Sequence, residues 1–375
     1  VSALIHAATM VTAGVYLVIR SNELYALIPE VGYGIACLGA FVAIFAATMA
    51  LVNNDMKRII AYSTLSQLGY MFVAAGLGAY WVALFHLATH AFFKSVLFLG
   101  AGNVMHAMDD ELDIRKMGGL HQKMKATSII MFVASLALAG IFPLAGFFSK
   151  DKILEAAFNA DAYILWATLW ITAGLTAFYS FRLVFKIFFG KQNYSDEQFH
   201  PHEAKSFVIA AMLPLAVLAV IAGWFEHAFI DFVTKILPSW EASNTASSTV
   251  WILILVTSAI AIGGIAVAYV KYFKGDGFSK EWENKAIYKL LINQYYVPQF
   301  YEKFVSKPYY AMSVWFFKVV EIKIIDNTID SIARFIYKLG TNIRVIQSGN
   351  LSTSLRLMVT GLIMGLVFAL VLAVI

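Results

Sequence analysis

Residues 138–154 read "LAGIFPLAGFFSKDKIL" and lie in the middle of an apolar run from 126 to 158. At about 1.5 Å per residue, one helix over that run would be about 50 Å long, whereas the hydrocarbon core of a bilayer is about 30 Å thick. Gly140, Pro143 and Gly146 interrupt the run, and proline lacks the N–H that an unbroken helix needs. Irregular backbone at membrane depth occurs where protein or water covers it, and in transporters it is common at binding sites. The stretch therefore predicts a membrane helix that is broken next to charged side chains.

The whole chain has the composition of a polytopic membrane protein. Of its 375 residues, 60% are hydrophobic and 14% are charged. Apolar runs long enough to span a bilayer recur along it. About nine such runs are predicted, at 3–20, 31–52, 59–77, 80–105, 126–158, 162–188, 206–226, 249–273 and 352–374. These runs predict an all-α polytopic membrane protein.

Charge and cysteine content exclude several other classes of protein. The formal net charge of +5 does not indicate nucleic-acid binding, because the basic residues lie in short loops between apolar runs. Their distribution predicts a first helix that starts in the cytoplasm and a last helix that ends outside. Cys37 is the single cysteine, so the sequence has no disulfide framework and no thiolate cluster for a metal or iron–sulfur centre. Because the sequence opens at Val1 within an apparent membrane helix, we expect it to be part of a longer chain.

A polar stripe crosses the run at 80–105. Its segment "FHLATHAFFKSVLF" (85–98) places His86, His90 and Lys94 four residues apart. Helical positions at this spacing drift by about 40°, so the three side chains share one face over about 12 Å. A lysine at mid-membrane costs roughly 2.5–3.5 kcal/mol on insertion scales, which predicts that this face meets a hydrated protein interior. Histidine and a buried lysine can both exchange protons near neutral pH, so the stripe predicts a proton relay.

Two other interpretations of the stripe stay open. Intramembrane histidines are often hydrogen-bonded packing residues, so the stripe can also be packing alone. An HxxxH pair can hold zinc, but Leu87 stands where an HExxH site has glutamate, and no carboxylate or thiol lies nearby.

Four further polar side chains are candidates for the same relay: His6, Lys57, Lys150 and Asp151. The alternatives are a packing residue for His6, a cytoplasmic anchor for Lys57 and snorkelling charges at a helix end for Lys150 and Asp151. The helix that Lys57 opens also offers hosts for ordered water, namely Ser63, Ser66, Gln67 and Tyr70. Arg182 and Lys186 lie near the cytoplasmic end of another run. Long basic side chains at such ends usually snorkel into water, so we interpret these two as anchors.

Residues 279–347 differ from the rest of the chain. They mix Lys, Glu and Asp with Trp, Phe, Tyr and Ile at helical spacing, which is too polar to span a membrane. We expect a long amphipathic helix on the cytoplasmic membrane surface, on the order of 100 Å long, with kinks at Pro298 and Pro308. The last run carries Gly361 and Gly365 as GxxxG, a weakly specific close-packing motif.

Five segments together carry a family resemblance: "SALIHAATMVTAGVYL" (2–17), "DMKRIIAYSTLSQLGYM" (55–71), "HLATHAFFKSVLFLGAGNVMHAM" (86–108), "IRKMGGL" (114–120) and "GFFSKDKIL" (146–154). They resemble the antiporter-like subunit L (chain 5) family of proton-translocating NADH:quinone oxidoreductase, respiratory complex I. The resemblance implies an antiporter-like bundle of inverted five-helix repeats, each with a broken helix, followed by a lateral helix and an anchoring helix.

The resemblance implies the following divisions: the last helix of the first repeat at 1–20, the second repeat at 31–188, two further membrane helices at 206–273, the lateral helix at 279–347 and the terminal helix at 352–374. His6 matches a histidine that follows the first-repeat lysine. Lys57, His86, His90 and Lys94 match the polar axis, and Lys150 and Asp151 match the pair at the broken helix near the periplasmic exit. The lysine–glutamate pair of the first repeat would lie before Val1.

The function that the resemblance implies is proton translocation coupled to electron transfer in other subunits. FMN, iron–sulfur clusters, NADH and quinone are expected in those partners, and no cofactor is expected in this chain. The expected partners are subunits M, N, K and J of the membrane arm, the lipid bilayer and protons, with no nucleic acid. The expected location is the bacterial inner membrane. Three alternatives are a cation/proton antiporter subunit of the Mrp type, a structural clamp of the membrane arm and, as the weakest, a metallopeptidase.

Overall fold

The computed structural model describes residues 1–375 except 196, 198, 239, 241–246, 276, 279, 346–348 and 375. Within this described part the protein is helical, and its one strand-like feature is an isolated bridge between Asp55 and Asp113. The all-α fold class predicted from the sequence is therefore confirmed. The chain divides into two compact units, Val1–Tyr295 and Tyr296–Ile375.

Among the described residues, seven helices are long and apolar enough to cross a membrane: Pro29–Val52, Met56–Gly76, Tyr80–Ala107, Tyr163–Phe189, Ser206–Val233, Ser248–Phe273 and Leu351–Val374. Two shorter apolar helices, Leu4–Arg20 and Lys125–Ala139, occupy the runs predicted at 3–20 and in the first half of 126–158. The nine predicted runs thus correspond to seven full-length spans and two shorter helices among the described residues, as expected for a multi-pass membrane protein.

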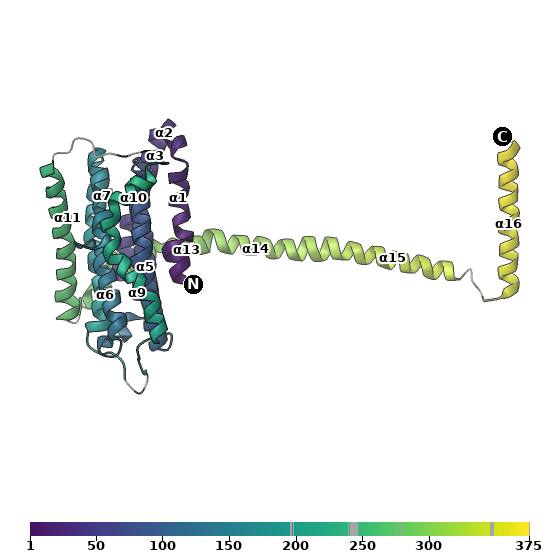
Figure 1. The fold of residues 1–375 in the computed structure, drawn as a ribbon. Helices are drawn as coiled ribbons and strands as arrows, with labels where there is room; N and C mark the ends of the chain where they lie inside the picture. The colour runs from purple at the N-terminus through teal and green to yellow at the C-terminus, as the bar shows by residue number, and fades with distance from the viewer. Residues whose placement is uncertain are drawn as a thin grey trace. The chain divides into compact units, whose positions relative to one another are not determined.

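The first unit is a helix bundle, with α5 (Tyr80–Ala107) in its middle (Figure 1). This helix contacts α4 (Met56–Gly76), α6 (Lys125–Ala139), α7 (Ala145–Asn159) and α9 (Ser206–Ile221). The other helices of the bundle are α1 (Ala13–Arg20), α2 (Asn22–Leu27), α3 (Pro29–Val52), α8 (Tyr163–Val184), α10 (Glu226–Val233), α11 (Ser247–Ala268) and α12 (Ala286–Ile292). Wide helical turns continue α8 over Phe185–Phe189 and α11 over Tyr269–Phe273.

Small residues allow α3 and α4 to pack backbone against backbone. A Cβ atom added to Gly39 would lie 2.7 Å from the carbonyl oxygen of Gly69, and one added to Gly69 would lie 2.5 Å from that of Gly39. Both distances are too short for real Cβ contacts, so only glycine permits this approach. The buried residues of α4 include polar ones, namely Ser63, Thr64, Ser66, Gln67 and Tyr70.

The run at 126–158 contains two helices with a non-helical segment between them. Helix α6 ends at Ala139, and Gly140 follows with φ +79°. The N–H of Gly140 donates to the carbonyl of Ala137, and that of Ile141 to the carbonyl of Leu136. This pairing is a Schellman motif, which satisfies carbonyls at a helix end. Gly140 therefore ends the helix before Pro143 is reached.

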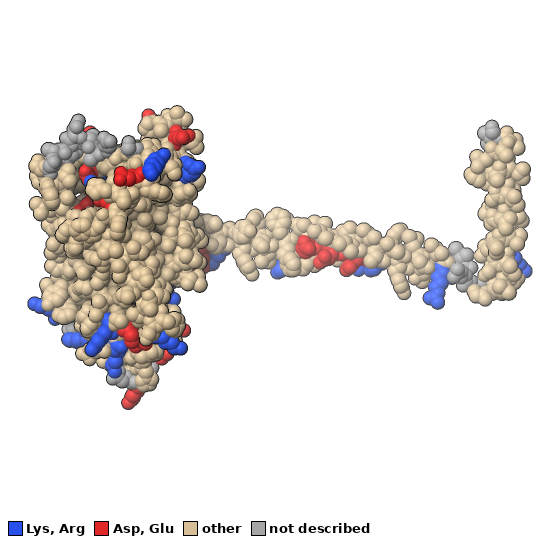
Figure 2. Space-filling view, in the orientation of Figure 1, with Lys and Arg blue, Asp and Glu red and all other residues tan. Residues whose placement is uncertain are grey.

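Basic side chains gather mainly at the lower end of the bundle, where α8 is joined to α9 (Figures 1 and 2). The positive-inside rule assigns this end to the cytoplasm.

The second unit is a run of helical segments followed by α16 (Leu351–Val374). The segments are α13 (Val297–Tyr301), Glu302–Ser306, α14 (Lys307–Phe316), Phe317–Asp326 and α15 (Asn327–Arg344). The helix continues through Pro308, since Ser306 and Lys307 keep right-handed helical angles. The preceding segment, Glu302–Ser306, forms wide π-type turns. The backbone instead leaves helical geometry shortly before Pro298, at Gln294–Tyr296, where φ is +56°, +55° and +58°.

Candidate functional site

The stripe on α5 is buried in the centre of the bundle. His86, His90 and Lys94 are 1%, 0% and 0% exposed. The ring centroids of His86 and His90 lie 6.2 Å apart on successive turns. One face of α5 therefore carries these titratable groups into an interior that lipid does not reach.

His86 connects three helices through hydrogen bonds. Its Nδ1 lies 2.9 Å from Ser149 Oγ on α7, and its Nε2 lies 3.1 Å from Gln67 Oε1 on α4. Ser149 Oγ is also 2.8 Å from Thr89 Oγ1, one turn along α5. Because Ser149 directly precedes Lys150, the stripe on α5 is joined to the helix that follows the break.

Lys94 lies at the other end of the stripe. Its Nζ donates to the backbone carbonyl of Ile60 at 3.3 Å, and no carboxylate pairs with it in the described part of the chain. A cavity of about 10 Å³ lies beside it, room for about one water molecule. The hydroxyl groups that line this cavity come from Ser63, Ser135, Tyr179 and Ser180. Lys94 thus has a weak neutral partner and a polar space next to it.

His90 lies between His86 and Lys94 on α5, with its ring near the backbone of Ala7. Within the described residues, neither ring nitrogen has a partner, and the ring packs edge-on against Phe93 with centroids 5.4 Å apart. A buried polar atom without a partner costs free energy of about 1–3 kcal/mol. Such groups in native proteins usually bind ordered water.

Lys150 reaches into the same core from α7. It is 1% exposed, and its Nζ lies 5.3 Å from the centroid of the Tyr70 ring, a cation–π distance. Among the described residues this Nζ has no hydrogen-bond partner. The lysine stem passes the break, since a Cβ atom on Gly140 would lie 3.6 Å from Lys150 Cδ, an ordinary van der Waals contact.

Asp151 follows Lys150 in sequence but lies in a different environment. It lines a pocket of about 220 Å³ with Glu155, Glu226 and Thr257. In the part of the chain that the structure describes, its Oδ2 has no hydrogen-bond partner and no ion pair joins it to Lys150. The two groups nevertheless lie close enough to act on each other electrostatically, with opposite charges.

Two of the predicted residues lie outside this cluster. His6 is exposed on the helical turn Leu4–Ala8, where its ring centroid is 6.2 Å from that of Phe98. Lys57 is half-buried at the start of α4, just after Asp55, which caps that helix by accepting from the N–H of Arg58. The structure thus brings together His86, His90, Lys94 and Lys150.

Arg182 does not snorkel into water as the sequence suggested. It is 4% exposed. Its Nη1 donates to the carbonyl of Asn53 at 2.6 Å, and its Nη2 donates to Asn54 Oδ1 at 2.7 Å. The interpretation as a snorkelling anchor was wrong, because the turn between α3 and α4 covers the guanidinium and supplies its acceptors.

The polar core also contains Ser149, Thr89, Tyr179 and Ser180, which the sequence did not indicate. Thr89 follows His86 by three residues and Ser149 precedes Lys150, so helical spacing offered a weak signal for both. Tyr179 donates to Ser63 Oγ at 2.7 Å from a helix 116 positions away. No local pattern can reveal such a contact.

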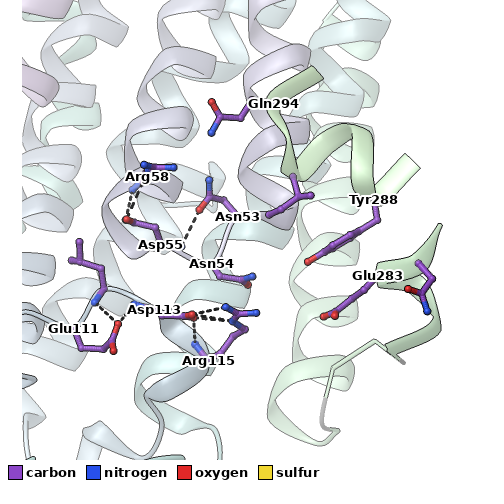
Figure 3. A pocket seen from close by; sticks show the side chains of 13 residues that line it. Asn53, Asn54, Asp55, Arg58, Glu111, Asp113, Arg115, Glu283, Tyr288 and Gln294 are labelled. Carbon is purple, nitrogen blue, oxygen red and sulfur yellow. Dashed lines mark hydrogen bonds and ion pairs between the residues drawn. The ribbon is translucent and has the colours of Figure 1, made fainter. Parts of the chain in front are cut away.

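A second polar region lies at the basic end of the bundle, in a pocket of about 730 Å³ (Figure 3). Asp113 binds Arg115 there, and Lys116 lies 2.5 Å from Glu111. The hydrogen bond from Lys116, followed by that from the N–H of Asp113, holds the pKa of the Glu111 carboxyl below its usual range. These ion pairs fix a loop whose backbone binds the turn between α3 and α4.

Comparison with known proteins gives a consistent picture. The family described as "NADH:quinone oxidoreductase/Mrp antiporter, TM" matches residues 1–176. NADH-quinone oxidoreductase subunit L of Campylobacter jejuni is 53% identical over 98% of this chain, which covers 59% of that protein. F(420)H(2) dehydrogenase subunit L of Methanosarcina mazei is 36% identical over 96% of this chain, which covers 58% of that protein. The chain therefore spans less than two thirds of the length of these relatives.

A solved structure, that of the Mrp complex from Dietzia sp., matches 99% of this chain and 37% of its own chain, with a TM-score of 0.53 and 24% identity. That likeness concerns the fold. The apolar helices and the bacterial relatives support a multi-pass protein of the inner membrane. Residues 1–176 carry the domain of the NADH:quinone oxidoreductase/Mrp antiporter transmembrane family, and the chain is similar to subunit L over nearly its whole length.

Proposed function

We propose that this chain is a proton-translocating membrane-arm subunit of an NADH-quinone oxidoreductase, and that its protons move through the lysines and histidines of α5 and α7. The observation that carries the proposal is the hydrogen-bonded junction of His86, Ser149 and Thr89. It links a buried titratable stripe to the helix that follows the break. Neither packing nor anchoring requires such a connection.

In this proposal Lys94 holds a proton at the centre of the membrane. His86 and His90 connect it with water, and Lys150 with Asp151 governs release towards the outside. The unpartnered nitrogens of His90 and Lys150 support hydration of this path, since buried polar groups are normally satisfied. Lys57 and His6 are proposed to lead protons towards the stripe.

Electrostatic repulsion supplies the coupling between these groups. Lys94 and Lys150 are both buried without an ion pair in the described part of the chain. When the amine of one lysine takes up a proton, a positive charge on the other lysine becomes less favourable. The two lysines therefore titrate together. A charge change in a neighbouring subunit can move the proton in the same way.

The first experiment replaces Lys94 with alanine in the full-length protein within the assembled complex. We expect proton pumping per NADH to fall, because the central proton site is lost. Pumping is measured with a pH-sensitive dye in inverted vesicles, alongside NADH oxidation. Lys123→Ala, at an exposed lysine in the loop before α6, is the control. Wild-type pumping and wild-type NADH oxidation in Lys94→Ala would refute this role.

Partners and cofactors follow from the same proposal. NADH, FMN, iron–sulfur clusters and quinone are assigned to other subunits, and subunits M, N, K and J are the proposed neighbours of residues 279–375. The similar subunit L of Methanosarcina mazei belongs to an F(420)H(2) dehydrogenase, which supports the idea that the electron donor is chosen outside this chain. The repeat divisions at 1–20, 31–188 and 206–273 are part of this proposal.

A subunit of an Mrp-type antiporter is the second candidate. It is favoured by the family description, which covers both protein classes, and by the fold likeness to the Mrp complex. Purification of the full-length protein from native membranes separates the two. Copurifying flavin and NADH:quinone reductase activity support the oxidoreductase. Sodium-dependent proton movement without NADH oxidation supports the antiporter.

A further inference from the structure

A pocket of about 490 Å³ opens at the basic end of the bundle, apart from the stripe. It lies where α3, α8 and the turn Tyr269–Phe273 end, and Gly277, Phe278 and residues 282–291 close its other side. These helix ends mark the border between hydrocarbon and water. A molecule in this pocket would therefore meet both environments at once.

The inner wall of the pocket carries two cations that no carboxylate neutralises within the described residues. Arg182 is buried, and its partners among the described residues are neutral: the oxygens of Asn53 and Asn54 and the side chain of Tyr272. Lys186 Nζ lies 5.5 Å from the Tyr272 ring centroid, and Arg182 Cζ lies 5.8 Å from the same centroid. Two positive charges thus flank one aromatic ring.

The remaining charged groups at the pocket do not cancel these two. Arg115 also lines it, but Arg115 is already bound to Asp113. Glu283 is exposed on the opposite wall, close to Tyr288 and across from Asn54 and Arg115 (Figure 3). Two unpaired cations against one carboxylate leave an excess of positive charge, which favours a ligand of net negative charge.

The rest of the lining is apolar or aromatic, which distinguishes the site from one for a soluble anion. The apolar side chains are Leu51, Val52, Leu175, Phe178, Phe278, Ile287 and Leu291. Trp282 stands at the pocket 45% exposed, and tryptophan and tyrosine favour the membrane–water border. Basic pockets between membrane helices on the cytoplasmic side bind acidic lipid headgroups.

We infer that this pocket binds a phospholipid of net negative charge, with its phosphate between Arg182 and Lys186 and its acyl chains against Leu175 and Phe178. The phosphodiester completes the charge balance that the protein leaves open. Its apolar chains cover a wall that would otherwise face water at the membrane border. The lipid stabilises the packing of α3, α8 and α11 and takes no part in the proton path.

The test uses the full-length protein in its purified complex, stripped of lipid and then incubated with phosphatidylglycerol or phosphatidylethanolamine. Native mass spectrometry measures the lipid that stays bound. We expect the wild type to retain phosphatidylglycerol in preference. Lys186→Gln should weaken retention about tenfold, because it removes a charge-assisted contact. Lys274→Gln is the matched control, since Lys274 lies at the same border, over the Tyr269 ring and outside the pocket lining.

Two further variants keep the inference open to refutation if Lys186→Gln fails to assemble. Lys186→Arg keeps the charge and should retain the lipid. Leu175→Trp fills the apolar part of the pocket and should release it while the cations stay in place. Equal retention in the wild type and Lys186→Gln overturns the site, and so does Leu175→Trp with full retention. Equal binding of phosphatidylethanolamine overturns the requirement for net negative charge.

Discussion

At the scale of single residues, the most informative feature is the burial of two lysines. Lys94 and Lys150 are nearly inaccessible to solvent, and in the described part of the chain neither has a carboxylate partner. Removing an ammonium from water costs several kcal/mol, which a weak bond to a carbonyl does not recover. Such lysines are expected to change protonation state readily, which suits proton transfer better than structural support.

Ser149 provides a sharp test at this scale. Ser149→Ala removes the hydroxyl that joins His86 to Thr89 and leaves every ionisable group in place. Losing a buried hydrogen-bond partner costs about 1–3 kcal/mol, so we expect coupled NADH oxidation to slow roughly tenfold. The rate is measured in membrane vesicles at matched amounts of assembled complex.

Thr168→Ala is the control for Ser149→Ala, since among the described residues the Thr168 hydroxyl bonds within its own helix, to the carbonyl of Ile164. Unchanged turnover in Ser149→Ala would mean that protons bypass this junction.

At the scale of secondary structure, the break between α6 and α7 positions the site. The Schellman motif at Gly140 stops α6. Gly146, in the first turn of α7, approaches the carbonyl of Ala137 so closely that a Cβ atom would collide with it. The second helix can then start beside the end of the first. This geometry delivers Ser149 and Lys150 to the core at mid-bundle.

Gly140→Ala tests the break. The left-handed φ of +79° costs alanine about 1 kcal/mol or more, and the new methyl group would contact Lys150 Cδ. We expect a lower melting temperature of the complex and lower pumping per NADH. Gly78→Ala is the matched control, because Gly78 has φ +83° but open space around it. The Gly78→Ala variant should have a lower melting temperature and unchanged proton pumping per NADH. Equal proton pumping per NADH in the two variants would contradict a role of the break in proton translocation.

At the scale of the whole molecule, the two units are built on different principles. The first unit buries extensive cores between its helices. In the second unit no described residue is buried. Its helix α15 nevertheless carries an exposed apolar stripe at helical spacing, formed by Ile329, Ile332, Phe335, Ile336, Leu339 and Ile343. Exposed apolar surface of this extent is typical of a segment that binds a membrane or another protein.

Deleting residues 296–375 tests this division. We expect the bundle to insert into the membrane, because its own contacts hold it together, and the assembled complex to be lost. Insertion is followed by protease protection and assembly by native gel electrophoresis. If the truncated chain assembles with wild-type yield, the second unit has no part in holding partners. If stripe variants such as Lys94→Ala pump normally while the deletion blocks assembly, the structural clamp becomes the better account.

The sequence by itself determined the fold class, the places of the apolar helices, the break near Gly140 and the stripe of His86, His90 and Lys94. These features depend on hydrophobicity and helical period, which are local properties. Only the tertiary structure decided that Arg182 is buried, that Asp151 and Lys150 form no ion pair among the described residues, that His6 lies outside the cluster, and that Ser149, Tyr179 and Ser180 complete the core. Each of these outcomes depends on which faces of helices distant in sequence meet, and packing between such faces leaves no periodic trace in either helix alone.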